Sequence, residues 1–219
     1  MISLPRTGKM VRSTLVDSLE LLILLLLPLP FLKLNAIYLL SALVIMFLSK
    51  YLRKEKWSFY GFRKVEQKLV IWAIALGVCY GFIDNFLIEP VMTRIVGAEP
   101  DLSAYKAVQG NVVNLILMLG LGWVVGGLFE EFFFRGYLYH RIFQIFPDPV
   151  LQKWIAVLAT SVVFAFAHDY QGIGGITSTF MFALVTGLLY FKMGRNVWYL
   201  ILFHGFYDTV GIFRLYFGA

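Results

Sequence analysis

The sequence predicts an all-α fold, a polytopic bundle of membrane-spanning helices. Hydrophobic residues make up 60% of the 219-residue chain and charged residues only 15%, and the mean hydropathy is +0.78. Apolar runs recur along the whole length, and each is close to the roughly 20 residues that a helix needs to cross a bilayer. Because no long linker and no internal repeat divides them, we expect one integral membrane domain over residues 1–219, with about seven transmembrane helices and eight possible.

Seven apolar runs define the expected spans, and the segments between them mark their ends. The first run follows basic residues, as a signal peptide does, but Asp17 and Glu20 interrupt it and a second run follows at once, so we expect it to remain as a span. A basic segment, 50–68, separates the second and third runs, and the longest polar connection, 93–110, precedes the fourth. Short turns separate the last three. The expected spans are 15–32, 34–52, 69–91, 111–141, 150–168, 174–193 and 197–217.

The distribution of basic residues predicts the orientation of the bundle. The chain has 19 Lys and Arg residues, and with the N-terminus inside only four fall on the outer side, which leaves 15 on the inner side. Positive charge is retained on the cytoplasmic side of membrane proteins, so we expect the N-terminus inside and the C-terminus outside. The N-terminal inner residues are Arg6, Lys9 and Arg12, and the four outer residues are Lys33, Arg94, Lys106 and Arg214.

Composition also excludes several classes of partner and site. The net charge of +6 comes from Lys and Arg in short segments between apolar runs, with no basic face on a soluble domain, so we expect the lipid bilayer and no nucleic acid as a partner. The single cysteine, Cys79, lies in an apolar run. It excludes an intrachain disulfide and a thiolate zinc site, and we expect it to be a small buried hydrophobe.

Ionisable residues within one apolar run mark a functional site inside the membrane. Glu130 and Glu131 interrupt the apolar stretch 115–134, and Arg135 follows directly. A charge near the bilayer centre costs roughly 3 kcal/mol even on the most lenient insertion scale, so these groups need partners or water. Glu131 and Arg135 are four apart and are expected to form an ion pair, whereas Glu130 is rotated by about 100° and faces a cavity as the candidate base. The glycine pair at 126–127 permits close helix approach or serves in ordinary packing.

Two of the three histidines also fall within apolar runs. Counting about 1.5 Å per residue from the inner ends of the spans places Glu130 about 17 Å deep, His168 about 21 Å and His204 about 12 Å, so the three side chains can meet near the middle of the membrane. Phe164 lies one turn before His168 and is expected to pack against its ring. His204 lies one turn before Asp208, whose carboxylate can orient or charge the imidazole.

Three short motifs, in this order on successive expected spans, resemble those of a known family. EEFFFRG at 130–136 fits EExxxRG, FAFAH at 164–168 fits FxxxH, and HGFYD at 204–208 fits HxxxN/D. Together they resemble the CPBP family, the CAAX protease and bacteriocin-processing or Abi family of intramembrane endopeptidases. The resemblance covers 111–217, the core of the chain that carries the motifs, and does not explain the first two spans.

The resemblance implies a glutamate-dependent endopeptidase in which water, activated by a glutamate and a histidine, attacks the peptide bond. The implied catalytic residues are Glu130 and His168 for the water and His204 and Asp208 for the oxyanion. The implied supporting residues are Glu131, Arg135 and Phe164. The implied substrate is a membrane-bound peptide or a lipidated protein, of CAAX type or from bacterial peptide maturation or immunity, reached from the inner leaflet. The chain resembles the compact prokaryotic members, so a prokaryotic cytoplasmic membrane is the expected location.

Asp208 and the histidines leave the mechanism open. The prenyl-protein endopeptidases of the family carry asparagine at this position, and an ionised aspartate cannot donate to an oxyanion, so Asp208 is either protonated or holds His204 as a cation. Zinc bound by Glu130, His168 and His204 is a further alternative, because two histidines and a carboxylate can leave an open coordination position. We favour the mechanism without metal or cofactor, because Glu130 is then free to act as the base.

Two noncatalytic functions compete with proteolysis. An Abi-type scaffold would bind other membrane proteins, and a transporter would use the buried charges as a proton relay. Asp84, Asn85 and Glu89 in the third span would suit a transporter's polar path, although structural pairing is the simpler expectation for each. The retention of every motif residue argues against a scaffold, and the inverted repeats that many transporters have are not apparent.

Overall fold

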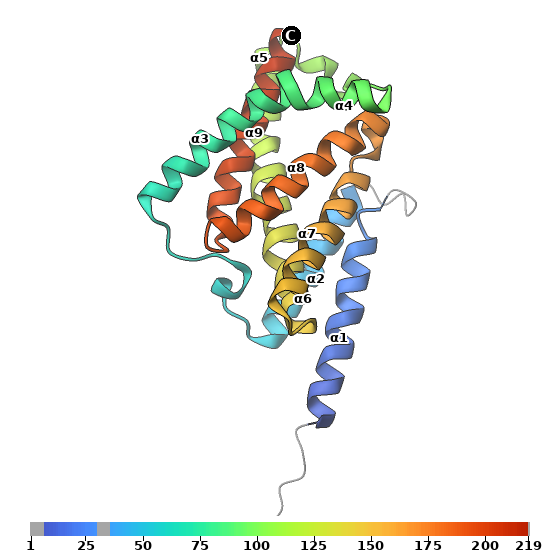
Figure 1. Cartoon of the computed structure of the whole chain (residues 1–219), viewed down its shortest axis with the longest axis vertical. Helices are drawn as coiled ribbons and strands as arrows, with labels where there is room; N and C mark the ends of the chain where they lie inside the picture. Colours follow the sequence, from blue (N-terminus) through green and yellow to red (C-terminus); the bar gives the residue numbers. More distant parts are fainter. Residues whose placement is uncertain (1–6, 30–35, 219) are drawn as a thin grey trace, which may run out of the picture.

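The computed structural model describes residues 7–29 and 36–218, and within these residues it contains helices and turns but no strand (Figure 1). The all-α prediction is therefore confirmed for the described part of the chain. Arg6 and Lys33, two residues of the orientation count, lie outside the described residues, as do residues 30–32 of the first expected span.

The helices follow one another along the chain with short connections. Those of the N-terminal half are α1 (Thr7–Leu26), α2 (Ala36–Arg53), η2 (Trp57–Tyr60), α3 (Gln67–Ile83), η3 (Asp84–Ile88), α4 (Glu89–Val96) and η4 (Ser103–Val108). Those of the C-terminal half are α5 (Val112–Leu121), η5 (Gly122–Leu138), α6 (Tyr139–Ile145), α7 (Pro149–Phe166), η6 (Asp169–Gln171), α8 (Gly172–Lys192) and α9 (Val197–Phe217). Segments η3 and η5 are wound as π-helix, a form found frequently at functional sites, and η5 carries both glutamates.

Polar residues begin the helices that shape the site. Asn111, Asp148 and Asn196 precede α5, α7 and α9, and each side chain accepts a hydrogen bond from a backbone N–H of the first turn. Helix α7 ends at Phe166, so His168 lies in the turn beyond it, whereas the expected span extended to residue 168. The tight connection to α8 ends α7 earlier than hydropathy indicates.

In the described part of the chain, four helical segments are long and apolar enough to cross a membrane. They are Gln67–Val96, Val112–Ile145, Pro149–Phe166 and Asp169–Lys192. The two longest join elements of different winding, α3 to α4 and α5 to α6, into continuous helices. The membrane-bundle architecture agrees with the prediction, but the expected count of seven spans is not confirmed.

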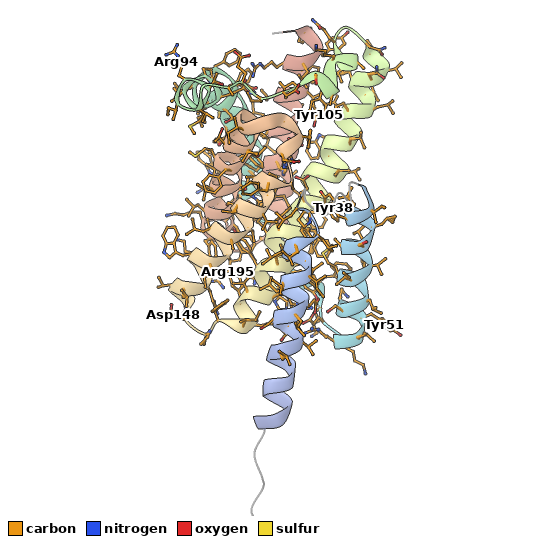
Figure 2. The ribbon with its side chains drawn as sticks, turned by 90° about the vertical axis from the view of Figure 1, so that its right-hand side faces the viewer. Tyr38, Tyr51, Arg94, Tyr105, Asp148 and Arg195 are labelled. Atoms are coloured by element: carbon orange, nitrogen blue, oxygen red, sulfur yellow. The ribbon has the colours of Figure 1, made fainter. Side chains whose placement is uncertain are left out.

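The bundle has two distinct ends, which Figure 2 shows from the side. Tyr51, Asp148 and Arg195 lie toward one end, and Arg94 and Tyr105 lie toward the other. The C-terminus lies near α4 and α5, at the second end (Figure 1). Helix α9 runs through the middle and packs against α3 on one side and η5 on another, while α7 packs against α8. The first end, where α2 finishes beside α6, carries several Lys and Arg residues, among them Lys50, Arg53, Lys54 and Arg141.

A polar cluster ties α2 and η2 to α6 at the basic end. Glu55 accepts hydrogen bonds from Arg141 at 2.7 and 2.8 Å, from the hydroxyl of Tyr60 and from His140. Burial alone would raise the pKa of the Glu55 carboxyl, but the hydrogen bonds outweigh it and hold the pKa well below its usual range. Arg141 is buried, and the Glu55 carboxylate is its main charge partner. This pair therefore anchors α6 to the segment between α2 and η2.

The outer surface of the bundle is largely apolar, and it overturns one prediction. Ile71, Trp72 and Phe82 of α3 are 60%, 53% and 52% exposed, as expected for side chains that face lipid tails. Cys79 of the same helix is exposed, so the expectation of a small buried hydrophobe is wrong. In a bilayer an apolar side chain is as stable against lipid as against the core, so hydrophobicity alone does not predict burial.

Candidate active site

Glu131, the second of the two adjacent glutamates of η5, lies in an ion pair inside the bundle. Glu131 is fully buried, and its Oε1 accepts a hydrogen bond from Arg135 at 3.1 Å, so the expected ion pair is present. Arg135 also donates to the carbonyl of Ala183 at 3.2 Å and to the hydroxyl of Thr186, both on α8. The pair therefore joins η5 to α8 as well as neutralising itself.

His204 of α9 is held between two carboxylates. Its Nδ1 lies 2.8 Å from Glu131 Oε1, and its Nε2 lies 3.5 Å from Asp208 Oδ1. The second contact follows the four-residue spacing, as expected. The first was not predicted, because Glu131 was assigned to Arg135 alone. The side chain of His204 is only 5% exposed, so Glu131 links the ion pair on η5 to the imidazole on α9.

His168 has a fixed ring orientation. Its Nδ1 lies 2.8 Å from the carbonyl oxygen of Phe164, and because a carbonyl only accepts, Nδ1 carries the hydrogen. The ring also packs against that of Phe164, with centroids 4.7 Å apart, as the spacing predicted. A neutral His168 therefore presents the lone pair of Nε2 away from the carbonyl.

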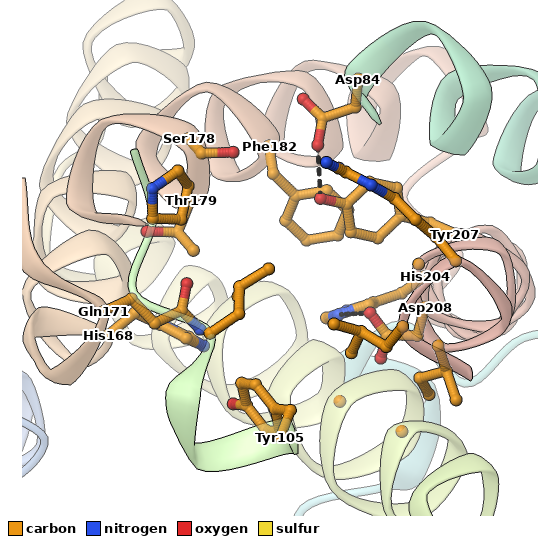
Figure 3. A pocket seen from close by; sticks show the side chains of 18 of the residues that line it. Asp84, Tyr105, His168, Gln171, Ser178, Thr179, Phe182, His204, Tyr207 and Asp208 are labelled. Atoms are coloured by element: carbon orange, nitrogen blue, oxygen red, sulfur yellow. Dashed lines mark hydrogen bonds and ion pairs between the residues drawn. The ribbon is translucent and has the colours of Figure 1, made fainter. Parts of the chain in front are cut away.

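The candidate residues share one cavity of about 470 Å³ (Figure 3). Glu130, His168, His204 and Asp208 all line it, so the predicted convergence of Glu130 and the two histidines is observed. In Figure 3, His168 lies on one side of the cavity and His204 with Asp208 on the other. Glu130 is mostly buried, in contrast to a charge that faces lipid.

Glycines allow α9 to approach η5 at the cavity. A Cβ on Gly126 would overlap the Asp208 carboxylate and lie 3.3 Å from His204 Nε2. A Cβ on Gly127 would lie 3.2 Å from the carbonyl oxygen of Ile201. Of the two roles considered for these glycines, close helix approach is therefore the one observed.

One wall of the cavity comes from the connection 98–110, which the sequence did not assign to the site. Tyr105 lines the cavity, and its hydroxyl lies 2.6 Å from that of Tyr170, next to the turn that holds His168. The N–H of Asp101 donates to the carbonyl of Gln171 at 2.8 Å. Contacts between segments so far apart in the chain leave no local pattern in the sequence, so this wall of the cavity could not be predicted from it.

The polar residues of the third span pair with α9 and extend the cavity. The hydroxyl of Tyr207 donates to Asp84 at 2.7 Å, and Nη1 of Arg214 donates to Asn85 at 2.7 Å. Arg214 also contacts both carboxylate oxygens of Glu89 at 3.1 Å. The structural pairing favoured for these residues is observed, and all five line the same cavity as Glu130.

The donor set does not fit the zinc alternative. Among the described residues, no three His, Cys, Asp or Glu side chains are grouped closely enough to hold a metal ion. His204 is instead engaged with Glu131 and Asp208, and Nδ1 of His168 with a carbonyl. We therefore derive no step through a metal.

The comparison with known families concerns the part of the chain that holds this cavity. Residues 112–210 match the family model described as type II CAAX prenyl endopeptidase Rce1-like. The match confirms the resemblance drawn from the three motifs. No curated protein and no solved structure gave a significant match to the chain.

Proposed function

We propose that this membrane protein, whose residues 112–210 match the Rce1-like family model, is a glutamate-dependent intramembrane endopeptidase of the CPBP family. The observation that supports the proposal most is the single cavity shared by Glu130, His168, His204 and Asp208. These residues come from η5, the turn after α7, and α9. Peptide hydrolysis needs a base, a group that positions the attacking water and an oxyanion donor around one reacting carbon, and side chains suited to these three roles line the cavity.

Glu130 and His168 are proposed to activate water. With Nδ1 of His168 bonded to the Phe164 carbonyl, Nε2 can accept a hydrogen bond from the attacking water and orient it. Glu130 takes the second proton of that water as its oxygen bonds to the peptide carbon. Glu130 then delivers this proton to the leaving nitrogen as the C–N bond breaks, which closes the proton balance of the hydrolysis.

His204 is proposed to stabilise the oxyanion. Its Nδ1–H donates to Glu131, while the 3.5 Å separation of Nε2 from Asp208 Oδ1 is longer than an ordinary hydrogen bond. An imidazolium with N–H at both nitrogens matches these two acceptors and can turn the Nε2–H to a developing oxyanion. Asp208 thus acts through His204, and Arg135 keeps Glu131 in place.

The proposed substrate is a membrane-bound peptide or a lipidated protein, as for a CAAX-type enzyme or a bacterial enzyme of peptide maturation or immunity. The proposed location is a prokaryotic cytoplasmic membrane, with the N-terminus inside and the C-terminus outside. Two variants in a Cys79→Ser background test the orientation: Lys106→Cys at the end near Tyr105, and Lys56→Cys at the basic end. An impermeant maleimide should label the first in intact cells and the second only after permeabilisation, and the opposite pattern would reverse the orientation.

Cleavage of a farnesylated peptide in proteoliposomes tests the proposed activity. Glu130→Gln should lower the rate about 10²- to 10⁴-fold, the usual contribution of a general base. Glu66→Gln, the same change at an exposed carboxylate outside the cavity, should leave the rate unchanged. An undiminished rate in Glu130→Gln would refute the assigned base. No cleavage of farnesylated or unmodified membrane peptides by the wild-type protein would favour the scaffold or transport alternatives.

A further inference from the structure

Arg195, in the turn between α8 and α9, is a half-buried arginine that contacts no carboxylate among the described residues. Its Cζ lies instead over two aromatic rings, 5.0 Å from the centroid of Phe143 and 5.2 Å from that of Phe191. An aromatic face attracts a cation but carries no net charge that would neutralise it. The other buried or half-buried arginines of the described residues each pair with Asp or Glu; they are Arg53, Arg135, Arg141 and Arg214.

The backbone at Arg195 is also unusual for an arginine. Its φ is 57°, in the left-handed region where a Cβ is costly and glycine is the usual residue. Gly194, directly before it, has a φ of 68°, so the turn places two successive residues in this region. Because glycine would fit the turn better, the turn geometry does not explain the arginine. Non-glycine residues held in such a conformation cluster at functional sites, including those that clamp ligands.

Lys153 of α7 brings a second positive charge to the same ring. Its Nζ lies 5.7 Å from the centroid of Phe191, so the charges of Lys153 and Arg195 are no more than about 11 Å apart. This is close to the Debye length of ~10 Å at 0.1 M salt, so both charges act on the same anion. Neither has a carboxylate within ion-pair distance in the described part of the chain. Asp148, in the neighbouring turn, uses its carboxylate to cap α7.

Both cations lie where candidate membrane spans end. Lys153 is near the start of the span Pro149–Phe166, and Arg195 follows the span Asp169–Lys192 by three residues. Figure 2 places Arg195 toward the same end of the bundle as the start of α7. Long basic side chains at the ends of spans reach the level of the lipid headgroups.

An apolar surface continues from this cluster along α7. Val150, Trp154 and Leu158 are exposed and four residues apart, so they form one stripe on the outside of the helix. A tryptophan at the end of a span is typical of the membrane–water interface. The cations and the stripe together present the two surfaces that an amphiphile needs, a charged one at headgroup level and an apolar one below it.

We propose that Arg195 and Lys153 bind the phosphate of an anionic phospholipid whose acyl chains lie along this stripe of α7. A phosphodiester accepts charge-assisted hydrogen bonds from guanidinium and ammonium groups, and basic pockets between membrane helices recognise anionic headgroups in this way. A soluble phosphate would match the cations but leave the stripe unused. Neither Arg195 nor Lys153 lines the cavity of Glu130, so the inference does not depend on the proposed endopeptidase function.

Binding of single lipids to the purified protein tests the inference, with native mass spectrometry from a neutral detergent as the readout. The probes are dioleoyl phosphatidylglycerol, which is anionic, and dioleoyl phosphatidylcholine, which has the same acyl chains but no net charge. Lys153→Gln and Arg195→Gln should each weaken phosphatidylglycerol binding about 5-fold, and the double variant about 30-fold, the usual effect of one and two basic side chains near a headgroup. Binding of phosphatidylcholine should not change.

Two matched variants show whether the position of the charge matters. Arg195→Lys keeps the charge and should keep most of the preference for phosphatidylglycerol. Lys56→Gln removes an exposed lysine between α2 and η2 and should keep all of it. An equal loss in Lys56→Gln would indicate diffuse attraction to a basic surface and would overturn the site.

Arg195→Gly separates lipid binding from a role in the fold. Glycine adopts the left-handed φ without cost, which offsets the lost ring contacts, so Tm in neutral detergent should stay close to the wild-type value. Phosphatidylglycerol binding should weaken as in Arg195→Gln. A lower Tm with an unchanged lipid preference would assign Arg195 to the fold and contradict the inference.

Two further outcomes concern the ligand itself. Equal binding of the two lipids by the wild-type protein, or a phosphatidylglycerol preference that survives in the double variant, would overturn the inference. Glycerol 1-phosphate, which has the phosphate but no acyl chain, should compete poorly with phosphatidylglycerol because it cannot use the apolar stripe. Efficient competition would identify a soluble phosphate, not a lipid, as the ligand.

Discussion

Replacing Arg135 with alanine tests whether the buried charges of η5 form a structural unit. Arg135 is 1% exposed and meets three acceptors: Glu131 Oε1 at 3.1 Å, the Ala183 carbonyl at 3.2 Å and the Thr186 hydroxyl. Its removal leaves the fully buried carboxylate of Glu131 with His204 as its remaining partner. Breaking a buried ion pair in this way costs about 3–5 kcal/mol in the free energy of unfolding.

The loss should be visible in thermal unfolding of the protein in a fixed detergent. One kcal/mol corresponds to about 2–4 °C in a chain of this length, so Arg135→Ala should lower Tm by roughly 6–20 °C. Arg94→Ala, at an exposed arginine of α4, should change Tm little. An unchanged Tm in Arg135→Ala, together with complete loss of cleavage, would refute the structural role and assign Arg135 to the substrate or the reaction.

A double variant separates the stability of the charge cluster from its placement of His204. Glu131→Gln with Arg135→Met removes both charges, and replacing a buried pair by apolar or neutral groups is often tolerated. The double variant should therefore recover most of the Tm lost in Arg135→Ala. Cleavage should stay low because the charged partner of His204 Nδ1 is gone. Recovery of both Tm and cleavage would show that Glu131 does not position His204.

Three further changes test the site and its support. Gly126→Ala should reduce cleavage because the methyl group would overlap the Asp208 carboxylate and crowd His204, while Gly120→Ala, with no atom within 4 Å, should leave the rate unchanged. Asp208→Asn should retain most of the cleavage activity, and exhaustive chelation should leave the wild-type cleavage rate unchanged. Loss of cleavage with a chelator and its recovery with added zinc would overturn the metal-free mechanism. Hydrogen bonds hold the pKa of Glu55 in the folded protein below its ordinary value of 4.5, so the stabilisation that the carboxylate provides is complete above pH 4.5 and is lost as the pH falls toward the lower, folded pKa. The Tm difference between wild type and Glu55→Gln should therefore shrink as the pH falls below 4.5, and a difference that does not change with pH would contradict this role.

Contacts four residues apart could be predicted from the sequence, as could the meeting of Glu130 and the two histidines at one depth, but the pairing of side chains between helices could not. The Glu131–Arg135 pair and the packing of Phe164 on His168 both follow from a four-residue spacing. The bond between Glu131 and His204 depends instead on how η5 is rotated against α9. The π-helical winding of η5 changes that rotation from the 100° per residue of an α-helix, and hydropathy gives no sign of it.

The cavity wall shows the same limit on a larger scale. The polar composition of 93–110 identified a connection between spans, and the structure places part of it over the site through Tyr105 and Tyr170. Residues Asp84 and Glu89 were recognised as costly in an apolar run, but their partners lie on α9, more than 100 residues later. The free-energy cost of a charge in an apolar run identifies a residue that needs a partner. Only the packing of the helices shows which residue that partner is.

The position of the cavity bears on two expectations, one about the orientation of the protein and one about the side from which the substrate enters. The bias of Lys and Arg predicts that the basic end of the bundle lies inside, and the family resemblance implies a substrate that arrives from the inner leaflet. The cavity, however, is lined by Tyr105 and by Arg214 near the end of α9, at the opposite and less basic end. In the proposed orientation, with the N-terminus inside, a peptide would therefore reach the cavity from the outer half of the membrane, and the two expectations do not both hold.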